Sequence, residues 1–457
     1  MLVSTLHTTH SHSDVLITDE IALPTLGSNT YAQKAPIVGL QVTQTLITAT
    51  TPVIDVLPAG EGAYPATAAW PMCTGRSNSM SANSALLGPS SSTSAVLGVA
   101  GNYSYSSLVV DDADNVYAVA QSGSNAILQK FNAAFVLQWS YTTTNIPFAG
   151  TNKFGFSLVL GSNGALYFVT SGGLHSVSAA TGVANWVNTL RGTNFYAITN
   201  LLLDAEGNIY CWSGGALFCV TPTGSIKWTT FTTAQVASMS LDATSGILYV
   251  IQFSVDRAEE ANQLMLNLFD HSTGTQLLTP VSSNTMYLLG RDMVNKMLPP
   301  VVGSQFVYVN TGRSLVAFTK TGAVAWSVPV WIPLRTTAAA MVYNEQLNIV
   351  YVSNTQSGVT LAVQKVAWTA LDGTTGLRLY ESAQVLTTNT FVVQPVIDSA
   401  NNLYVYDSAG VFRVFNAALT QVAAVTQAAT FGAPPPLALT VGGKLLAATS
   451  AGIYVVS

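Results

Sequence analysis

The chain has 457 residues but few charged side chains: 16 Lys and Arg and 21 Asp and Glu make up only 8% of the sequence, and the net charge is −5. Because the basic residues are few and scattered, no run of them can neutralise several phosphates, and nucleic-acid binding is not expected. No window of about 18 residues is apolar throughout, so no transmembrane segment is predicted.

Residues 1–62 differ from the rest of the chain and are predicted to form an extended N-terminal arm. The arm begins with a polar, nearly uncharged stretch that contains His7, His10 and His12. Three neighbouring imidazoles could bind a transition metal, but no Cys or carboxylate lies among them, so a polar arm is the favoured interpretation. The first Lys is Lys34, so the basic-then-apolar pattern of a secretory signal is not recognised.

The second part of the arm, Ile37 to Leu57, is rich in Val, Ile and Thr and alternates in part. Such a segment could pair with a sheet edge of this chain or of a partner. We therefore predict contacts between the arm and other protein subunits, including further copies of this chain.

The stretch Leu203–Trp228 (LDAEGNIYCWSGGALFCVTPTGSIKW) sets a pattern that recurs to the end of the chain. A polar turn with Gly207 and Asn208 leads into a run rich in β-branched and aromatic residues, and two further turns separate two more such runs. This antiparallel meander is too small to bury its own apolar face. The turn and its strand recur in eight units, which are Asp112–Tyr117, Gly161–Tyr167, Asp204–Tyr210, Asp242–Tyr249, Gly303–Tyr308, Asn344–Tyr351, Asp398–Tyr404 and Gly442–Leu446. A spacing of roughly 40 to 60 residues is typical of propeller blades.

In several units a turn, usually Thr-Gly, is followed by a Trp, as at Trp139, Trp186, Trp228 and Trp326. The regular place of Tyr and Trp in the repeat predicts that they pack between blades, each burying about 150–250 Å². Carbohydrate stacking is the less favoured interpretation.

These repeats resemble those of the pyrroloquinoline-quinone-like (quinoprotein-type) β-propeller superfamily, which pair a D-x-x-G-N-x-Y turn and strand with a later T-G-x-x-x-W. The stretch Ala69–Arg76 (AWPMCTGR), followed by Gly88-Pro89, resembles the W-P-M opening that precedes the first full blade in that family. The likeness covers about residues 66–457 and implies an all-β, eight-bladed propeller of four-stranded antiparallel blades over residues 63–457.

Ring closure is predicted to use both ends of the propeller. The last blade, from Pro436, has room for three strands before Ser457. We expect the segment around Ala66–Met72 to supply the missing outer strand and to place Trp70 where other blades carry Trp. Such closure stops the ring from opening at one edge.

The fourth blade carries insertions, and long propeller loops are where binding sites form. Its hairpin from Ser254 to Gln263 holds the densest charge cluster of the chain, for which a solvated hairpin tip is the plain alternative. Trp331 and Trp368 stand outside the Trp pattern and are candidates for a surface contact. The connection that follows this hairpin also contains charged residues. The candidate interaction residues are therefore Asp256, Arg257, Glu259, Glu260, Arg291, Asp292, Trp331 and Trp368.

Other polar residues have structural interpretations. Asp111, Asp112 and Asp114 resemble part of a calcium loop but lack its Gly and distal Glu, so they are predicted to be turn residues. Cys211 and Cys219 lie on adjacent strands of one hairpin; a cross-strand disulfide is conceivable, and buried free thiols are favoured.

Enzymes of the resembled superfamily typically have adjacent cysteines, a calcium site of Glu, Asn and Asp, and a catalytic Asp at the centre of the ring. No two cysteines are adjacent here and the carboxylates do not match such a set, so no catalytic, metal or cofactor-binding residue and no cofactor is assigned. The sequence favours a non-enzymatic structural or protein-interaction propeller, a subunit of a large assembly such as a virion surface or an extracellular layer. The alternatives are a quinoprotein-like oxidoreductase or ligand-binding propeller, and a glycan-binding adhesin.

Overall fold

The computed structural model describes most of the chain after residue 85. The described residues are 86–89, 95–100, 104–144, 158–190, 200–232, 234–255, 262–278, 285–288, 299–311, 314–330, 341–357, 364–383, 385–387, 395–406, 411–426, 437–449 and 452–457. The chain divides into two compact units, Met1–Thr51 and Pro52–Ser457, and all described residues belong to the second. The predicted arm, with His7, His10, His12 and Ile37–Leu57, lies outside them, and its boundary at residue 62 stays a prediction.

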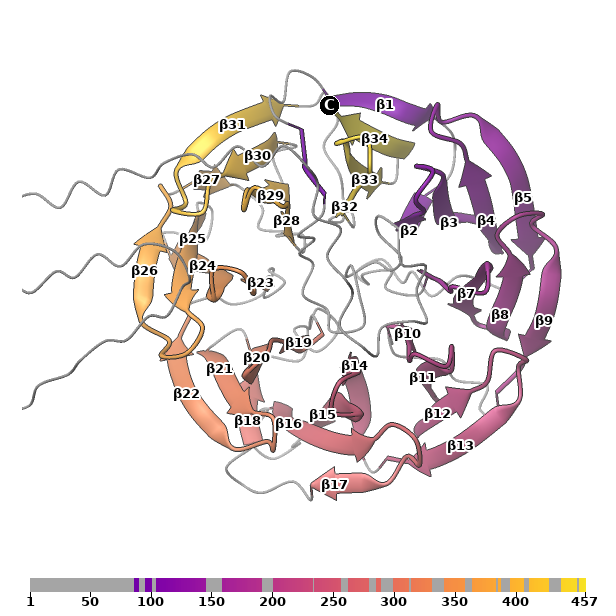
Figure 1. Cartoon of the computed structure of the whole chain (residues 1–457), viewed down its shortest axis with the longest axis horizontal. Helices are drawn as coiled ribbons and strands as arrows, with labels where there is room; N and C mark the ends of the chain where they lie inside the picture. The colour runs from indigo at the N-terminus through magenta and orange to yellow at the C-terminus, as the bar shows by residue number, and fades with distance from the viewer. Residues whose placement is uncertain are drawn as a thin grey trace, which may run out of the picture. The chain divides into compact units, whose positions relative to one another are not determined.

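The described residues form eight antiparallel sheets arranged as the blades of a ring (Figure 1), and none of them is helical. Within this part of the chain, accordingly, we find no helix with the length and apolar character needed to cross a membrane. The predicted eight-bladed propeller of four-stranded blades is confirmed.

Each of the first three blades runs from an inner strand to an outer strand in chain order. Blade one comprises β2 (Ser104–Val110), β3 (Val116–Ser122), β4 (Asn125–Phe131) and β5 (Leu137–Thr143). Blade two comprises β6 (Leu158–Leu160), β7 (Ala165–Thr170), β8 (Gly173–Ser178) and β9 (Ala184–Asn188). Blade three comprises β10 (Leu202–Leu203), β11 (Ile209–Ser213), β12 (Ala216–Val220) and β13 (Ile226–Phe231).

Blades four and six are enlarged, as their middle strands are longer and a fifth strand pairs with the third. Blade four comprises β14 (Gln235–Asp242), β15 (Ile247–Val255), β16 (Asn262–Asp270), β17 (Gln276–Leu278) and the additional β18 (Thr285–Leu288). Blade five comprises β19 (Val301–Val302), β20 (Phe306–Asn310), β21 (Ser314–Thr319) and β22 (Val324–Pro329). Blade six comprises β23 (Met341–Asn344), β24 (Ile349–Ser357), β25 (Gln364–Asp372), β26 (Arg378–Glu381) and the additional β27 (Val385–Thr387).

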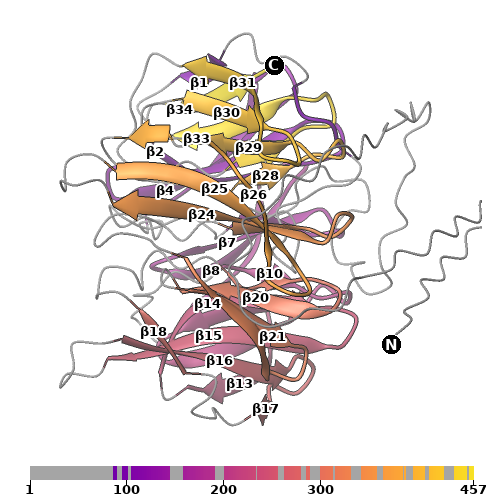
Figure 2. The ribbon, with the colours of Figure 1, turned by 90° about the vertical axis from the view of Figure 1, so that its left-hand side faces the viewer.

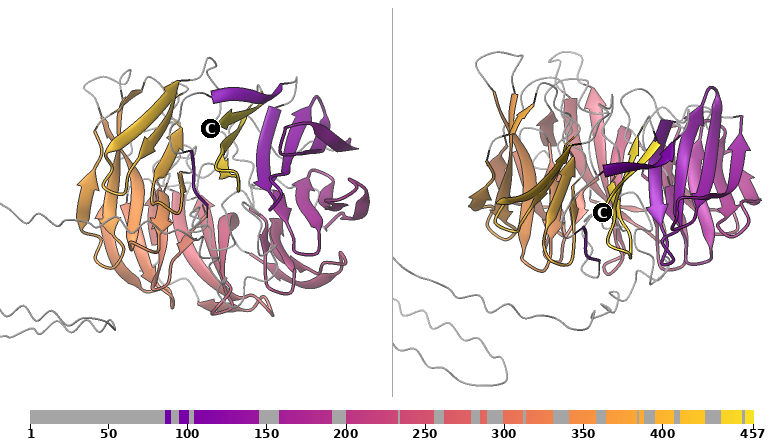
Figure 3. Two further views of the ribbon diagram at one scale, coloured as in Figure 1. Left: turned by 45° about the horizontal axis from the view of Figure 1, so that its top comes forward. Right: turned by 90° about the horizontal axis from the view of Figure 1, so that it is seen from above.

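The last two blades complete the ring. Blade seven comprises β28 (Val396–Ile397), β29 (Leu403–Tyr406), β30 (Val411–Phe415) and β31 (Gln421–Thr426). Blade eight comprises β32 (Leu437–Leu439), β33 (Leu445–Thr449), β34 (Gly452–Val456) and the N-terminal strand β1 (Ala95–Ala100) as its outer strand. Figure 3 shows β1 in indigo beside the yellow strands at the C-terminus.

Closure by both ends is therefore confirmed, but the closing strand is not the predicted one. β1 pairs with β34 from Ala95 opposite Val456 to Ala100 opposite Gly452, so the expectation that Ala66–Met72 supplies this strand was wrong. Trp70 itself lies outside the described residues. Trp70 was a poor guide to the closing strand, because blade eight has no Trp at the position where the outer strands of other blades carry one. Val96, opposite Val455, occupies that position.

Neighbouring blades stack side by side around the ring (Figures 1 and 2), and the core lies between them. Strands β7, β11 and β12 are buried along their whole length because each is covered by a neighbouring sheet on either side. One apolar cluster joins Val119 and Leu128 of blade one to Phe168 of blade two, and another joins Leu217 of blade three to Leu248 of blade four. Stacking thus buries the apolar faces that one meander leaves open.

Candidate functional site

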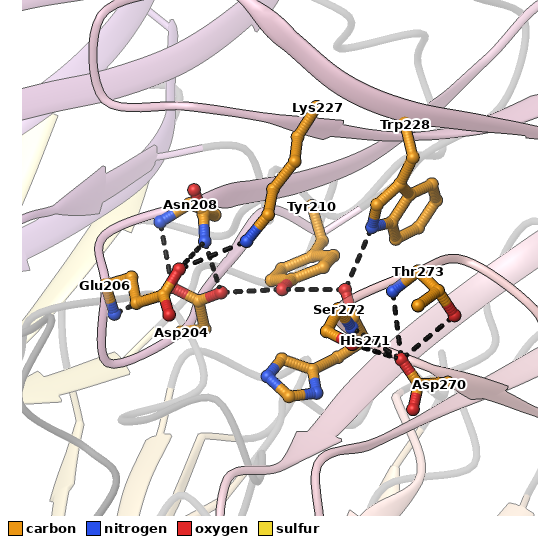
Figure 4. A network of polar contacts seen from close by, with 10 residues as sticks. All are labelled: Asp204, Glu206, Asn208, Tyr210, Lys227, Trp228, Asp270, His271, Ser272 and Thr273. Carbon is orange, nitrogen blue, oxygen red and sulfur yellow. Dashed lines mark hydrogen bonds and ion pairs between the residues drawn. The ribbon is translucent and has the colours of Figure 1, made fainter.

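The polar groups of the repeat gather at the turns, and blade three shows their geometry best (Figure 4). Asp204, only 5% exposed, begins the turn between β10 and β11. Its Oδ1 accepts hydrogen bonds from the backbone N–H groups of Glu206 and Asn208, both at 2.9 Å. Its Oδ2 accepts from Asn208 Nδ2 and from the Tyr210 hydroxyl, both at 2.7 Å. The carboxylate is used to hold its own turn, as Asn and Asp do in Asx turns.

The same arrangement recurs at Asp111 in blade one and Asp398 in blade seven. Asp111 accepts from the Asn115 backbone at 2.8 Å and from the Tyr117 hydroxyl at 3.0 Å. Asp398 accepts from the Tyr404 hydroxyl at 2.8 Å. The prediction that the Asp111 stretch is a blade turn is confirmed.

The Tyr and Trp of a blade face the same side of its sheet. Tyr210 of β11 lies opposite Cys219 of β12, which lies opposite Trp228 of β13. The rings of Tyr210 and Trp228 are 5.9 Å apart across the small Cys219 side chain. Tyr–Trp pairs at 5.9–6.1 Å recur in blades one, two and five, namely Tyr117–Trp139, Tyr167–Trp186 and Tyr308–Trp326.

Each pair contacts the turn that joins the third and outer strands of the next blade. The Tyr210 hydroxyl and Trp228 Nε1 both donate to the His271 carbonyl of blade four, at 3.1 and 2.9 Å. The indole of Trp228 covers Gly274, where a Cβ would come within 2.6 Å of the ring. The prediction that these aromatic residues pack between blades is confirmed.

Ion pairs add little in blade three and more between blades four and five. Lys227 and Glu206 are 3.1 Å apart but Glu206 is exposed, so solvent screens the pair. Hydrogen bonds from Asn208 and Lys227 hold the pKa of Glu206 below its usual range. Lys320 of blade five lies 2.9 Å from the largely buried Asp242 of blade four. Burial opposes ionisation of Asp242, but its bond from Lys320 holds its pKa below the usual value.

Among the described side chains, no group of three or more His, Cys, Asp or Glu is placed to hold a metal ion. The buried His175 has hydroxyl partners: Tyr141 lies 3.2 Å from Nδ1 and Thr170 lies 2.9 Å from Nε2. Burial lowers the pKa of His175 to about 4, so the imidazole is neutral at pH 7 and stacks on Phe168 with ring centroids 4.8 Å apart.

Cys211 and Cys219 are free and buried, as favoured from the sequence. Cys219 pairs with Tyr210 and Cys211 pairs with Phe218, so the two thiols point to opposite faces of the sheet. A disulfide between them is therefore ruled out by the register of the hairpin.

Trp368 is not a surface residue, contrary to the sequence prediction. It is 3% exposed and belongs to an apolar cluster with Tyr351 of its own blade and Leu403 of blade seven. It escapes the Trp pattern because it lies on the third strand, β25, and not on an outer strand. The other candidate interaction residues, Asp256, Arg257, Glu259, Glu260, Arg291, Asp292 and Trp331, lie outside the described residues.

Two features were missed by sequence reasoning. The first is an exposed aliphatic residue on the outer strand of each of blades one to seven, 43–56% exposed: Leu137, Val187, Ile226, Leu277, Val324, Leu379 and Val422. We call this set the rim residues. Successive side chains of a strand point to opposite faces, and the Trp of an outer strand faces the next blade. The aliphatic residues on the opposite face could therefore have been found from their spacing to the Trp. The second is the segment Leu86–Pro89, which packs between blades seven and eight.

No family model matches this sequence, and no curated protein matches it. Among solved structures, the fold resembles quinohemoprotein alcohol dehydrogenase from Comamonas testosteroni, with a TM-score of 0.62 and 11% identity over 86% of this chain and 81% of that one. It also resembles a europium-containing methanol dehydrogenase (TM-score 0.55, 11% identity, 82% and 88%) and BamB from Moraxella catarrhalis (0.50, 17%, 80% and 98%). The resemblance to quinoprotein-type propellers is confirmed at the level of the fold.

Proposed function

We propose that this chain is a non-enzymatic structural propeller that binds other protein subunits through its rim, within a large assembly such as a virion surface or an extracellular layer. The observation that carries the proposal is the set of rim residues, which repeats around the ring. Scattered apolar side chains are normal on a protein surface. Here, however, an exposed aliphatic side chain lies on the outer strand of each of seven successive blades, which is a regular pattern.

The charge of the rim supports protein contacts. The seven outer strands that carry the rim residues contain only three charged side chains, Lys227, Arg378 and Glu381. Arg378 and Glu381 neutralise each other at 2.8 Å. Interface cores are likewise depleted of charge, because burying an unpaired charge is costly.

The outer strands favour side-chain contacts over strand addition. In each of blades one to seven the register between the third and outer strands shifts by one residue, which marks a β-bulge. Bulges twist an edge and hinder pairing with a further strand. The rim is therefore suited to contacts through its aliphatic side chains.

The test compares lysine substitutions on and off the rim in the full chain. Val187→Lys, Ile226→Lys and Val324→Lys together place charge on three outer strands, and Leu347→Lys, in the turn between β23 and β24, is the matched control. Sedimentation velocity of the purified chain and incorporation of tagged chains into the native assembly are measured. We expect the triple variant to lose association at least tenfold and Leu347→Lys to behave as wild type.

Unchanged association of the triple variant would refute the role of the rim. A quinone absorbance band or stoichiometric calcium in protein from the native source would refute the structural role and would favour a quinoprotein-like oxidoreductase. Specific binding on a glycan array would favour an adhesin. Recovery of the chain outside any large assembly in its native source would refute the virion or extracellular-layer setting.

A further inference from the structure

The seam between blades seven and eight is built differently from four other seams of the ring. In four other seams a Tyr hydroxyl donates, at 2.9–3.1 Å, to a carbonyl in the turn between the third and outer strands of the next blade: Tyr210 to His271, Tyr249 to Lys320, Tyr308 to Gly373 and Tyr351 to Ala417. Blade eight has no such turn, because its outer strand β1 precedes blade one in the chain. Tyr404 of blade seven donates to Asp398 of its own blade, as Tyr210 also donates to Asp204, but blade eight offers it no turn of this kind to contact.

The segment Leu86–Pro89 lies where the missing turn would be. Its backbone is held at two points: the Leu86 carbonyl accepts from the Ser399 N–H at 2.6 Å, and the Gly88 N–H donates to Asp398 Oδ2 at 3.1 Å. Leu86 is 8% exposed and belongs to an apolar cluster shared by blades seven, eight and one, and Pro89 is buried as well. Leu87, between the anchored residues, is exposed.

Gly88 meets the Tyr of blade seven as Gly373 meets the Tyr of blade five. A Cβ on Gly373 would lie 2.8 Å from the Tyr308 hydroxyl oxygen, and a Cβ on Gly88 would overlap the hydroxyl oxygen of Tyr404. The Tyr404 ring is buried and tied to Asp398, so it is not free to move aside. The contact therefore requires glycine at this position of the segment.

We propose that this seam is a peptide-binding site for an extended Leu-Leu-Gly-Pro segment, which the chain fills with its own residues 86–89. Three features define the ligand: a Leu side chain in the apolar cluster, two backbone hydrogen bonds, and a Gly that passes Tyr404. Main-chain bonds with one side-chain pocket are a common mode of peptide recognition. The proposal is independent of the role assigned to the rim.

The test uses the full chain and a fluorescent peptide of residues 84–91 (SALLGPSS). In the wild-type chain the tethered segment has a high effective concentration, and we expect no peptide binding by fluorescence anisotropy. In the Gly88→Ala chain the segment is expelled, and we expect the peptide to bind at least tenfold more tightly than the same peptide with Gly88→Ala. Equal binding of the two peptides, or no binding of either, would overturn the proposal.

If the Gly88→Ala chain does not fold, hydrogen exchange of the wild-type chain decides the matter. We expect the Ser399 and Gly88 amides to exchange as slowly as the paired amides of β29. Exchange of either amide at the rate of an unstructured peptide would show that the segment does not occupy the seam, and the proposal would fall.

Discussion

Replacing Tyr210 by Phe tests whether the shared hydroxyl holds blades three and four together. The substitution removes one O–H that donates to Asp204 Oδ2 at 2.7 Å and to the His271 carbonyl at 3.1 Å, and keeps the ring against Trp228. Asp204 is buried, and its Oδ2 keeps only the bond from Asn208 Nδ2 among those described above. A hydrogen bond to a charged group contributes about 1.5–3 kcal/mol, so we expect a loss of about 2–3 kcal/mol.

Tyr351→Phe is the matched control for this prediction. Tyr351 is equally buried and occupies the same position in blade six, but its hydroxyl donates to the neutral Ala417 carbonyl at 2.9 Å. Loss of a bond between neutral groups costs about 0.5–1.5 kcal/mol. The structure therefore predicts that Tyr210→Phe is more destabilising than Tyr351→Phe by about 1–2 kcal/mol.

Native-state hydrogen exchange is the appropriate assay, because a ring of this size need not unfold in one step. The amides of β11 report on blade three and those of β24 on blade six. A loss of about 2 kcal/mol corresponds to roughly 30-fold faster exchange in β11. Equal acceleration in the two variants, or acceleration spread evenly over all blades, would refute the role given to the Asp204 bond.

Three further predictions concern His175, Gly224 and Cys211. Burial lowers the pKa of His175 from 6.5 to about 4, so the folded state binds this proton more weakly than the unfolded state does. Stability is therefore lost as the pH falls from about 6.5 to 4, by about 3 kcal/mol in total. Thermal melts over this range should show a smaller loss for His175→Gln; equal loss would contradict the assignment. Gly224→Ala, at φ +89° with a Cβ 2.8 Å from the Trp186 indole, should cost about 1–3 kcal/mol more in urea unfolding than Gly215→Ala, at φ +90° with open space around it. Burial raises the pKa of Cys211 to about 12, so iodoacetamide should modify this thiol only on unfolding, and rapid modification of the native protein at pH 8 would contradict its burial.

The blades were predictable because their signals are local. The turn at Asp204 and the strands at Ile209, Ala216 and Ile226 follow from turn residues and β-branched runs within one stretch, and β11, β12 and β13 begin at those three residues. The period of the repeat then fixes the number of blades. By contrast, the burial of Trp368 depends on which strand carries it, and the facing of Cys211 and Cys219 depends on the register of the hairpin. Neither can be read from residue type alone.

The closing strand was missed because blade eight lacks the Tyr and the Trp that mark the repeat. β1 reads AVLGVA, without Trp, and Leu446 replaces the Tyr of the other blades. Searching for a Trp therefore pointed to Trp70. The contacts of Leu86–Pro89 were also out of reach, because they join residues about 310 positions apart in the sequence.

The distribution of Trp around the ring follows from the turn that each outer strand meets. Trp139, Trp186, Trp228 and Trp326 each cover a glycine of the next blade, Gly182, Gly224, Gly274 and Gly376, all at positive φ. The Trp is absent where the turn of the next blade carries a larger residue at positive φ. Blade six has Tyr380 at the Trp position, and the turn of blade seven contains Leu419. Blade eight has Val96 at this position, and the turn of blade one contains Phe135. Blade seven has Ala423 at the Trp position, and the blade after it, blade eight, has no turn between its third and outer strands. The turn of blade five contains Gly322, but blade four has Leu278 at the Trp position, so a glycine in the turn permits a Trp without requiring one. The side chain on one blade and the turn on the next thus form one packing unit, and it is this unit, not the single blade, that the sequence repeats.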